Sequence, residues 1–216
     1  MITIYEKLNI SAIKAKIMAV SALFGGLENF TKFVANYFVI WYNYFVKGAA
    51  YLQELRFKEE SEIFYYRTGA IIIEDNHVLI IKSDAVDYLY SVGGAVNHGE
   101  AAEDAIRREV YEETGVNYEI ERLVFVYENI FQENGLNFHG IEFFFLMKPR
   151  GTREGLVCKS HGMDSAKEHL HWLPLNGMDD VQLYPKFFKT RLHSLPLGIE
   201  MLKRTINDEI CGSLVV

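Results

Sequence analysis

Residues 93–116, GGAVNHGEAAEDAIRREVYEETGV, constrain the fold more than any other part of the chain. The segment opens on two glycines and holds six acidic residues, two arginines and no proline. Glu109, Glu112 and Glu113 are spaced i, i+3 and i+4, which places them on one face of a helix. Like charges at this spacing repel one another. The segment therefore predicts a helix over about 100–113, ended by Gly115, whose carboxylates need a counter-charge.

A hard divalent cation would supply that charge, because an oxygen-only ligand set favours Mg²⁺ or Mn²⁺. Gly93 and Gly94 would let the backbone come close to a metal ion or a phosphate, where a Cβ would obstruct. Arg108 stands beside the carboxylates and could orient one of them by a bidentate contact. The alternative is a solvated acidic helix face. It accounts for the acidity of the segment but not for the joint spacing of its glycines, arginine and glutamates.

The spacing is that of a known signature. Counted from Gly94, five residues precede Glu100, seven more precede Arg108, and the segment then continues as REVYEETGV. This resembles the Nudix hydrolase signature GX5EX7REUXEEXGU, in which U is aliphatic, and every fixed position is filled. The resemblance covers about residues 53–195. It implies an α/β fold, a Nudix-type α/β/α sandwich with a mixed sheet, and Mg²⁺-dependent hydrolysis of a nucleoside diphosphate linked to another group X.

The resemblance also implies roles for the residues of the signature. Glu109 and Glu113 would bind the metal most directly, and Glu112 would be a co-ligand or the group that activates water. A supporting salt-bridge role is implied for Arg108 and Glu100. A structural role at the start of the helix is an equal alternative for these two residues.

Other candidates lie outside the signature. The family often adds a further glutamate from a strand or loop, and Glu142 is the first candidate for this metal ligand, with Glu128 behind it; an ordinary strand glutamate is the alternative for both. Arg67 could bind a phosphate or be a surface arginine. His98 is predicted to be a surface residue rather than a base.

The rest of the chain after about residue 53 reads as strands and short helices. The segment 67–82, RTGAIIIEDNHVLIIK, predicts a hairpin that turns at 74–76. Further strands are predicted at DYLYSVGG, YEIERLVFVYENI, FHGIEFFFLMK and HLHWLPL. Pro185 could open a helix through Arg191, and LGIEMLKRTI (197–206) predicts another helix. A long loop is expected at 150–167.

The first fifty residues differ in charge, with five lysines against two glutamates. Their apolar pattern predicts an N-terminal helical extension, a hairpin whose second helix carries an i, i+3, i+4, i+7 stripe over 30–46. The uncharged run in that helix is 14 residues, and a membrane span needs roughly 20. Packing on its own domain is favoured over interfacial membrane contact by 30–46. A homodimer contact is a third alternative.

The net charge of −7 argues against a broad nucleic-acid-binding surface but not against a nucleotide substrate. Cys158 and Cys211 are expected to be reduced thiols, and no signal peptide is evident, so a cytoplasmic location is predicted. The sequence does not identify the group X. A non-catalytic Nudix-like nucleotide-binding or regulatory module remains as the second function, but the complete set of glutamates favours an enzyme.

Overall fold

The computed structural model describes residues 53–158, 167–206 and 208–215, and residues 53–216 form a unit of their own. Strands dominate it. In chain order the elements are β1 (Arg56–Glu59), β2 (Glu62–Ile71), β3 (Ile73–Glu74), β4 (His77–Ser83), β5 (Leu89–Ser91), β6 (Gly93–Ala95), α3 (Ala102–Thr114), β7 (Ile120–Glu133), β8 (Leu136–Met147), β9 (Glu168–Pro174), the 3₁₀-helix η4 (Leu175–Asp180), β10 (Leu183–Tyr184), α4 (Phe188–Arg191), β11 (Glu200–Thr205) and β12 (Asp208–Val215).

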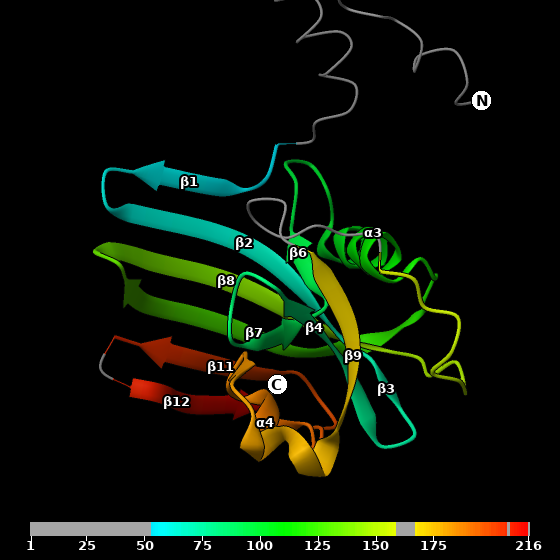
Figure 1. The fold of residues 1–216 in the computed structure, drawn as a ribbon. Coiled ribbons are helices and arrows are strands. Elements are labelled where there is room, and N and C mark those ends of the chain that lie inside the picture. Colours follow the sequence, from blue (N-terminus) through cyan, green and yellow to red (C-terminus); the bar gives the residue numbers. More distant parts are fainter. Residues whose placement is uncertain (1–52, 159–166, 207, 216) are drawn as a thin grey trace, which may run out of the picture. The chain divides into compact units, whose positions relative to one another are not determined.

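These strands form two sheets (Figure 1). The larger has the order β1-β2-β8-β7-β11-β12, and β6 adds to β2. It is mixed, because β2 and β8 are parallel, β8 and β7 antiparallel, and β7 and β11 parallel. The smaller sheet has the order β10-β5-β4-β3, with β9 paired to β4. The prediction of an α/β fold with a mixed sheet is confirmed.

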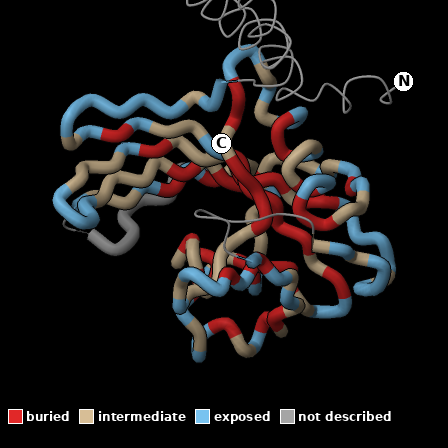
Figure 2. Tube along the Cα trace, turned by 45° about the horizontal axis from the view of Figure 1, so that its top comes forward, coloured by how far each residue is buried: buried red, intermediate tan, exposed pale blue. Residues whose placement is uncertain are grey.

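Strand β4 ties the core together, because both of its faces are buried. Val78 and Ile80 belong to one apolar cluster, shared with β7, β8 and α4. Leu79 and Ile81 belong to a second cluster, shared with α3. Side chains alternate between the faces of a strand, so a strand buried on both sides reads as a continuous apolar run. Figure 2 shows the buried residues gathered where the two sheets meet and becoming fewer toward the far ends of the long strands.

Helix α3 is the predicted helix, and it begins two residues later than expected. Ala105, Ile106 and Val110 are fully buried and hold it against the sheets. Gly115 ends it in the left-handed conformation, with φ of 72°, which favours glycine. The apolar stripe beside the glutamates therefore has the packing role that its spacing predicts.

The expected strands are present; β7 runs three residues past its predicted end, and β8 begins two residues before its predicted start. The hairpin turns at Asp75 and Asn76, between β3 and β4. The predicted helix from Pro185 forms only as the four residues of α4.

The helix predicted at 197–206 is wrong. Residues Glu200–Thr205 form β11, which pairs in parallel with β7 and antiparallel with β12. Burial alternates along it, with Glu200 and Leu202 buried and Met201 and Lys203 exposed. Pairing on both sides outweighs the local helix preference of this segment, since strand formation depends on partners that are distant in sequence.

The predicted N-terminal helical hairpin, with its proposed packing, membrane or dimer roles, lies outside the described residues. In the part of the chain that the structure describes, no helix has the length and apolarity needed to cross a bilayer.

Candidate active site

The glycines of β6 are required by close contacts on both sides. Gly93 has φ of 140°, and a Cβ there would lie 2.2 Å from the carbonyl oxygen of Thr68 on β2. A Cβ on Gly94 would lie 2.3 to 2.5 Å from the carboxylate atoms of Glu109. Only glycine fits such positions without displacing a neighbour. The two glycines thus let β6 approach β2 and let a carboxylate of α3 approach β6, a role that the sequence did not predict.

Helix α3 turns two of its three clustered glutamates toward β6. The Oε2 atom of Glu113 accepts a hydrogen bond of 2.8 Å from the backbone nitrogen of Gly93, and Glu113 is 7% exposed. Glu109, one turn earlier, lies against Gly94. The side chain of Glu112 is 54% exposed. The helical spacing therefore brings two of the predicted carboxylates inward and leaves the third near solvent.

The two inward carboxylates repel one another. Burial raises the pKa of Glu113 well above its usual value, and the negative charges of Glu109 and Glu168 raise it further. Burial also raises the pKa of Glu109, although the Arg108 guanidinium opposes this shift. A buried carboxylate without a full counter-charge is costly. This pair is the place in the site where an added cation would be most favourable.

Arg108 links Glu100, which precedes α3, to the end of β6 and to two of the clustered glutamates. Its Nε and Nη2 atoms donate to the two oxygens of Glu100 at 2.8 and 2.9 Å, a bidentate pair. Its Nη1 donates to Glu109 at 2.7 Å and to Glu112 at 3.2 Å, and Nη2 also donates to the carbonyl oxygen of Ala95 at 3.1 Å. The hydrogen bond from Arg108 is the largest cause of the lowered pKa of Glu100, and hydrogen bonds from Asn97 lower it further. Arg108 therefore contacts two of the clustered glutamates, Glu100 and the end of β6, and the supporting role expected for it stays a prediction.

A family model described as NUDIX domain matches residues 65–191. The chain belongs to this family. The match covers more than half of the chain and contains most of β2 and everything from β3 to α4, so the glycines, the carboxylates and Arg108 all lie inside it. The predicted family is confirmed.

Known relatives match the Nudix chain only in part. A Bacillus subtilis (strain 168) protein named "Putative 8-oxo-dGTP diphosphatase" is 38% identical over 66 residues, which are 29% of this chain and 44% of that protein. The match therefore spans less than half of that relative. A crystal structure of a mutator MutT protein from Bacillus halodurans aligns with a TM-score of 0.48 at 18% identity, over 70% of this chain and 97% of that one. A MutT NUDIX hydrolase from Burkholderia pseudomallei aligns with a TM-score of 0.42 at 24% identity, over 53% and 85%.

The residues predicted outside the signature fall in different places. Arg67 on β2 is exposed, with Nη2 3.4 Å from the carbonyl oxygen of Gly93, and its charge lowers the pKa of both Glu109 and Glu113. Glu142 lies on β8, hydrogen-bonded to two side chains of neighbouring strands. Arg67 is therefore near the α3 carboxylates, whereas the hydrogen bonds of Glu142 Oε1 are made within the sheet.

Two further predicted residues are on the surface. Glu128 pairs with His139 at 3.0 Å and with Lys203 at 3.6 Å, in contacts between exposed or half-exposed side chains. His98 is exposed in the loop before α3. These positions agree with an ordinary strand glutamate for Glu128, which was its alternative, and with the surface position predicted for His98.

Glu168 is a further acidic residue near the α3 carboxylates that the sequence did not predict. It begins β9, is 8% exposed and accepts a hydrogen bond of 2.5 Å from the Tyr90 hydroxyl. After burial and the charge of Glu109, its charge is a further cause that raises the pKa of Glu113. The only signal was an acidic residue at the start of a predicted apolar strand. Nothing local shows that the pairing of β9 with β4 brings it toward α3.

The chemistry of this donor set fits a hard divalent cation. The inward groups are all carboxylates, Glu109, Glu113 and Glu168, and a cation would relieve the repulsion that raises the pKa of Glu113. Within the described ranges, no three acidic, histidine or cysteine side chains are already grouped to hold a metal ion. Binding of one cation by all three carboxylates would therefore require their side chains to move closer together.

Proposed function

We propose that this chain is a divalent-metal-dependent pyrophosphohydrolase. Its substrate would be a nucleoside diphosphate linked to a group X, or a nucleoside triphosphate. Water would add across the phosphoric anhydride bond to give a nucleoside monophosphate and phospho-X or pyrophosphate. The observation that carries the proposal is the mutually repelling pair of buried Glu113 and partly buried Glu109 behind Gly93 and Gly94. Family membership supports the same reaction class.

In this proposal Glu109 and Glu113 hold Mg²⁺ or Mn²⁺, with Glu112 and Glu168 as further ligands. The cation would neutralise the phosphates and polarise the bond to be broken. Glu142, the further ligand expected from the sequence, is a weaker candidate than Glu168, because its bonded oxygen already accepts two hydrogen bonds within the sheet.

The remaining roles belong to the protein's own groups. Arg108 holds Glu109 and Glu112 in place through its bonds to both. Arg67, which projects beside Gly93, would bind a phosphate oxygen. The water proton would go to a carboxylate that is not fully engaged by the cation, and Glu112 and Glu168 are the candidates. Glu112 is more exposed and so reaches solvent more readily.

A substrate screen tests the reaction. Nucleoside triphosphates, including oxidised ones, and nucleoside diphosphate derivatives would be incubated with Mg²⁺ or Mn²⁺, and released monophosphate would be measured. The name of the Bacillus subtilis relative makes 8-oxo-dGTP one of the first compounds to include. Turnover should depend on the metal and be lost in Glu113→Gln but kept in Glu103→Gln, an exposed first-turn residue of α3. Turnover unaffected by Glu113→Gln would contradict the mechanism.

The second function is a nucleotide-binding module without turnover. The observation in its favour is that no metal-holding group of three side chains is preassembled in the described residues. Binding of nucleotides without hydrolysis of any compound would support this module. A cytoplasmic location and a homodimer also stay predictions. Gel filtration of the full-length protein, compared with a form lacking residues 1–50, tests the dimer.

A further inference from the structure

A second polar cluster lies on the larger sheet, on the face that β7 and β8 share with the apolar core. Tyr65 on β2, Asn129 on β7 and Glu142 on β8 form it. The Tyr65 hydroxyl donates to Glu142 Oε1 at 2.9 Å. The Asn129 Nδ2 donates to Glu142 Oε1 at 3.1 Å and to the Tyr65 oxygen at 3.0 Å. Three strands thus position one carboxylate, which we call the Glu142 cluster.

The cluster is built around a glycine. A Cβ on Gly140 would lie 2.0 to 2.4 Å from the ring and hydroxyl atoms of Tyr65. The register explains this contact, since Tyr65 pairs with Gly140 across the parallel β2–β8 ladder. Only a residue without a side chain lets the tyrosine ring lie across β8 and reach Glu142. The arrangement therefore depends on four residues of three strands.

The Glu142 cluster offers acceptors and few donors. Both bonds to Glu142 fall on Oε1, and Oε2 takes part in neither. The Asn129 Oδ1 is buried and has no hydrogen-bond partner among the described residues. The Tyr65 proton is already directed at the carboxylate, and burial raises the pKa of Tyr65, so it stays protonated. A ligand that meets this cluster satisfies it best by presenting adjacent hydrogen-bond donors.

The cluster lies next to the phosphate side of the site. Arg67 pairs with Glu142 across the same ladder and follows Tyr65 on the same face of β2. The same arginine is near the carbonyl oxygen of Gly93 and acts on the pKa of Glu109 and Glu113. A nucleotide with its phosphates at Arg67 and α3 would therefore extend its remaining part over the Glu142 cluster.

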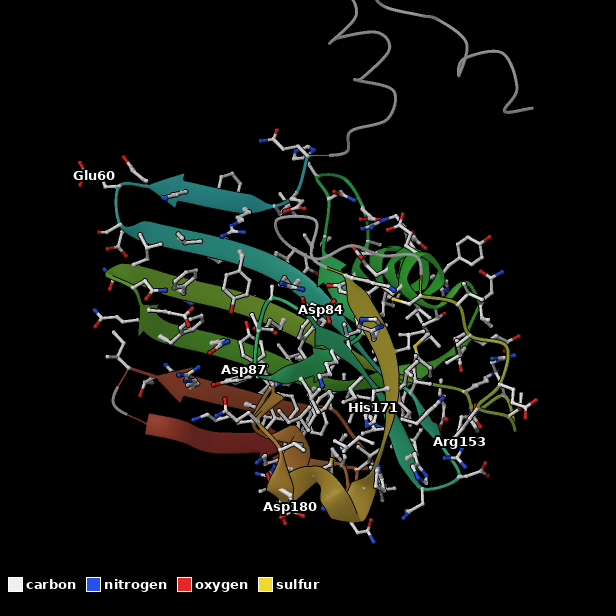
Figure 3. The ribbon with its side chains drawn as sticks, viewed as in Figure 1. Glu60, Asp84, Asp87, Arg153, His171 and Asp180 are labelled. Atoms are coloured by element: carbon white, nitrogen blue, oxygen red, sulfur yellow. The ribbon has the colours of Figure 1, made fainter. Side chains whose placement is uncertain are left out.

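Aromatic rings border the cluster. The rings of Phe131 and Phe138 stack at 4.6 Å with 3° between their planes, and the Arg204 guanidinium lies 5.0 Å from the Phe131 centroid. Tyr88 lies just before β5; burial raises its pKa most, the charge of Glu133 raises it further and the charge of Arg67 lowers it, so these side chains are near it. Figure 3 labels Asp84 and Asp87 on the segment between β4 and β5 that leads to Tyr88. Aromatic rings beside a hydrogen-bonding cluster suit a planar heterocycle, which can stack on the rings while its edge meets the cluster.

We propose that Glu142, held by Tyr65 and Asn129, selects the base of the nucleotide and favours guanine-type bases over adenine. Guanine presents two neighbouring donors, N1–H and the N2 amino group, which match a carboxylate. Adenine presents an unprotonated N1 in the same region, and its lone pair would face the carboxylate. An 8-oxoguanine base keeps both guanine donors, so the cluster accepts it. The assignment rests on the proposed function, because it takes the phosphates to lie at α3.

The test compares guanine with adenine nucleotides in wild-type protein and in Glu142→Gln. Glutamine keeps the shape of the side chain but presents one donor and one acceptor. We expect the ratio of kcat/KM for dGTP to that for dATP to fall at least tenfold, mainly through lower activity on dGTP. Glu128→Gln, on the neighbouring strand β7 with exposed ionic contacts, is the matched control and should leave the ratio unchanged. An equal loss on both substrates would overturn the assignment and favour a metal-ligand role for Glu142.

A binding measurement separates this inference from the proposed reaction. Affinities for GMP and AMP would be measured by calorimetry with EDTA present, so that neither metal nor turnover is needed. Wild-type protein should bind GMP more tightly, and Tyr65→Phe, which keeps the ring over Gly140, should reduce that preference. Equal affinities in wild-type protein, or no binding of either nucleotide, would overturn the base assignment. If hydrolysis is absent but GMP is preferred, the proposed function fails while the base assignment stands.

Discussion

The carboxylates of α3 and the carboxylate of Glu142 are held in opposite ways. Buried Glu113 and partly buried Glu109 lie close to each other's charge, and loss of solvent contact raises the pKa of both. Glu142 accepts hydrogen bonds from Tyr65 and Asn129 and so has partners within the sheet. The first arrangement is costly without a cation, and the second is already stabilised. The difference is the basis of our two proposals, a metal ion for the α3 carboxylates and a hydrogen-bond donor for Glu142.

The largest effect is expected when a carboxylate of the repelling pair is neutralised. We expect Glu113→Gln to lower kcat/KM by about 100-fold or more, as for loss of a group that stabilises the transition state. The same change should leave the thermal stability of the metal-free protein equal or higher, because it removes a repelling buried charge. Enzyme kinetics and calorimetry check both parts. A marked loss of stability would show that the Gly93 hydrogen bond matters more than the repulsion.

The next prediction concerns the glycine behind the pair. Gly93→Ala should destabilise the protein by about 3 kcal/mol or more, because a strained φ and a clash with the Thr68 backbone act together. Gly151→Ala is the control, since Gly151 has φ of 77° but a Cβ added there would meet nothing within 4 Å. In Gly151→Ala the free energy of unfolding should fall only by the strain of the left-handed backbone, about 1 kcal/mol. Urea unfolding measures the loss of unfolding free energy in both variants. Equal losses would show that close packing against Thr68 does not contribute.

A smaller effect is expected at the residue that positions the pair. Arg108→Lys cannot keep the bidentate bond to Glu100 together with those to Glu109 and Glu112. We expect kcat to fall about tenfold, as for loss of a group that orients ligands, with a modest loss of stability. Arg107 has a side chain that is 52% exposed, so Arg107→Lys should leave kcat and stability unchanged. Similar kinetics for the two variants would leave Arg108 without a positioning role.

The smallest effect is a pH dependence of stability. Because the pKa values of Glu109 and Glu113 are raised on folding, the folded protein binds more protons than the unfolded chain above an unfolded value of about 4.3. Their stabilising contribution is present below that value and is lost as pH rises through the folded pKa. We expect the free energy of unfolding in EDTA to fall from about pH 5 toward neutrality, and Mg²⁺ to oppose the fall.

Urea titrations at several pH values check this slope. They begin near pH 5, because the lowered pKa of Glu100 acts in the opposite direction in more acidic solution. Glu113→Gln should flatten the slope. A slope that Glu113→Gln leaves unchanged would assign the pH dependence to other groups.

Local sequence spacing was enough to predict the α3 carboxylates. The helix period places Glu109 and Glu113 together, and Gly115 ends the helix, because both follow from backbone geometry within a few residues. The helix predicted at 197–206 failed because β11 depends on β7, whose paired residues lie far earlier in the chain. The orientation of Glu112 toward solvent also depends on how far α3 rotates against the sheets.

The Nudix family, helix α3 and the carboxylates that would hold a cation were predictable from the sequence alone, since each is encoded in short-range spacing. Only the tertiary structure decided that Glu168 lies near Glu113 and that Tyr65, Asn129 and Glu142 share one face. The charge of Glu168 on β9 acts on Glu113 of α3, and hydrogen bonds join β2 to β7 and β8. Strand pairing and register bring them about, and the hydrogen bonds that fix a register connect residues that no local pattern relates.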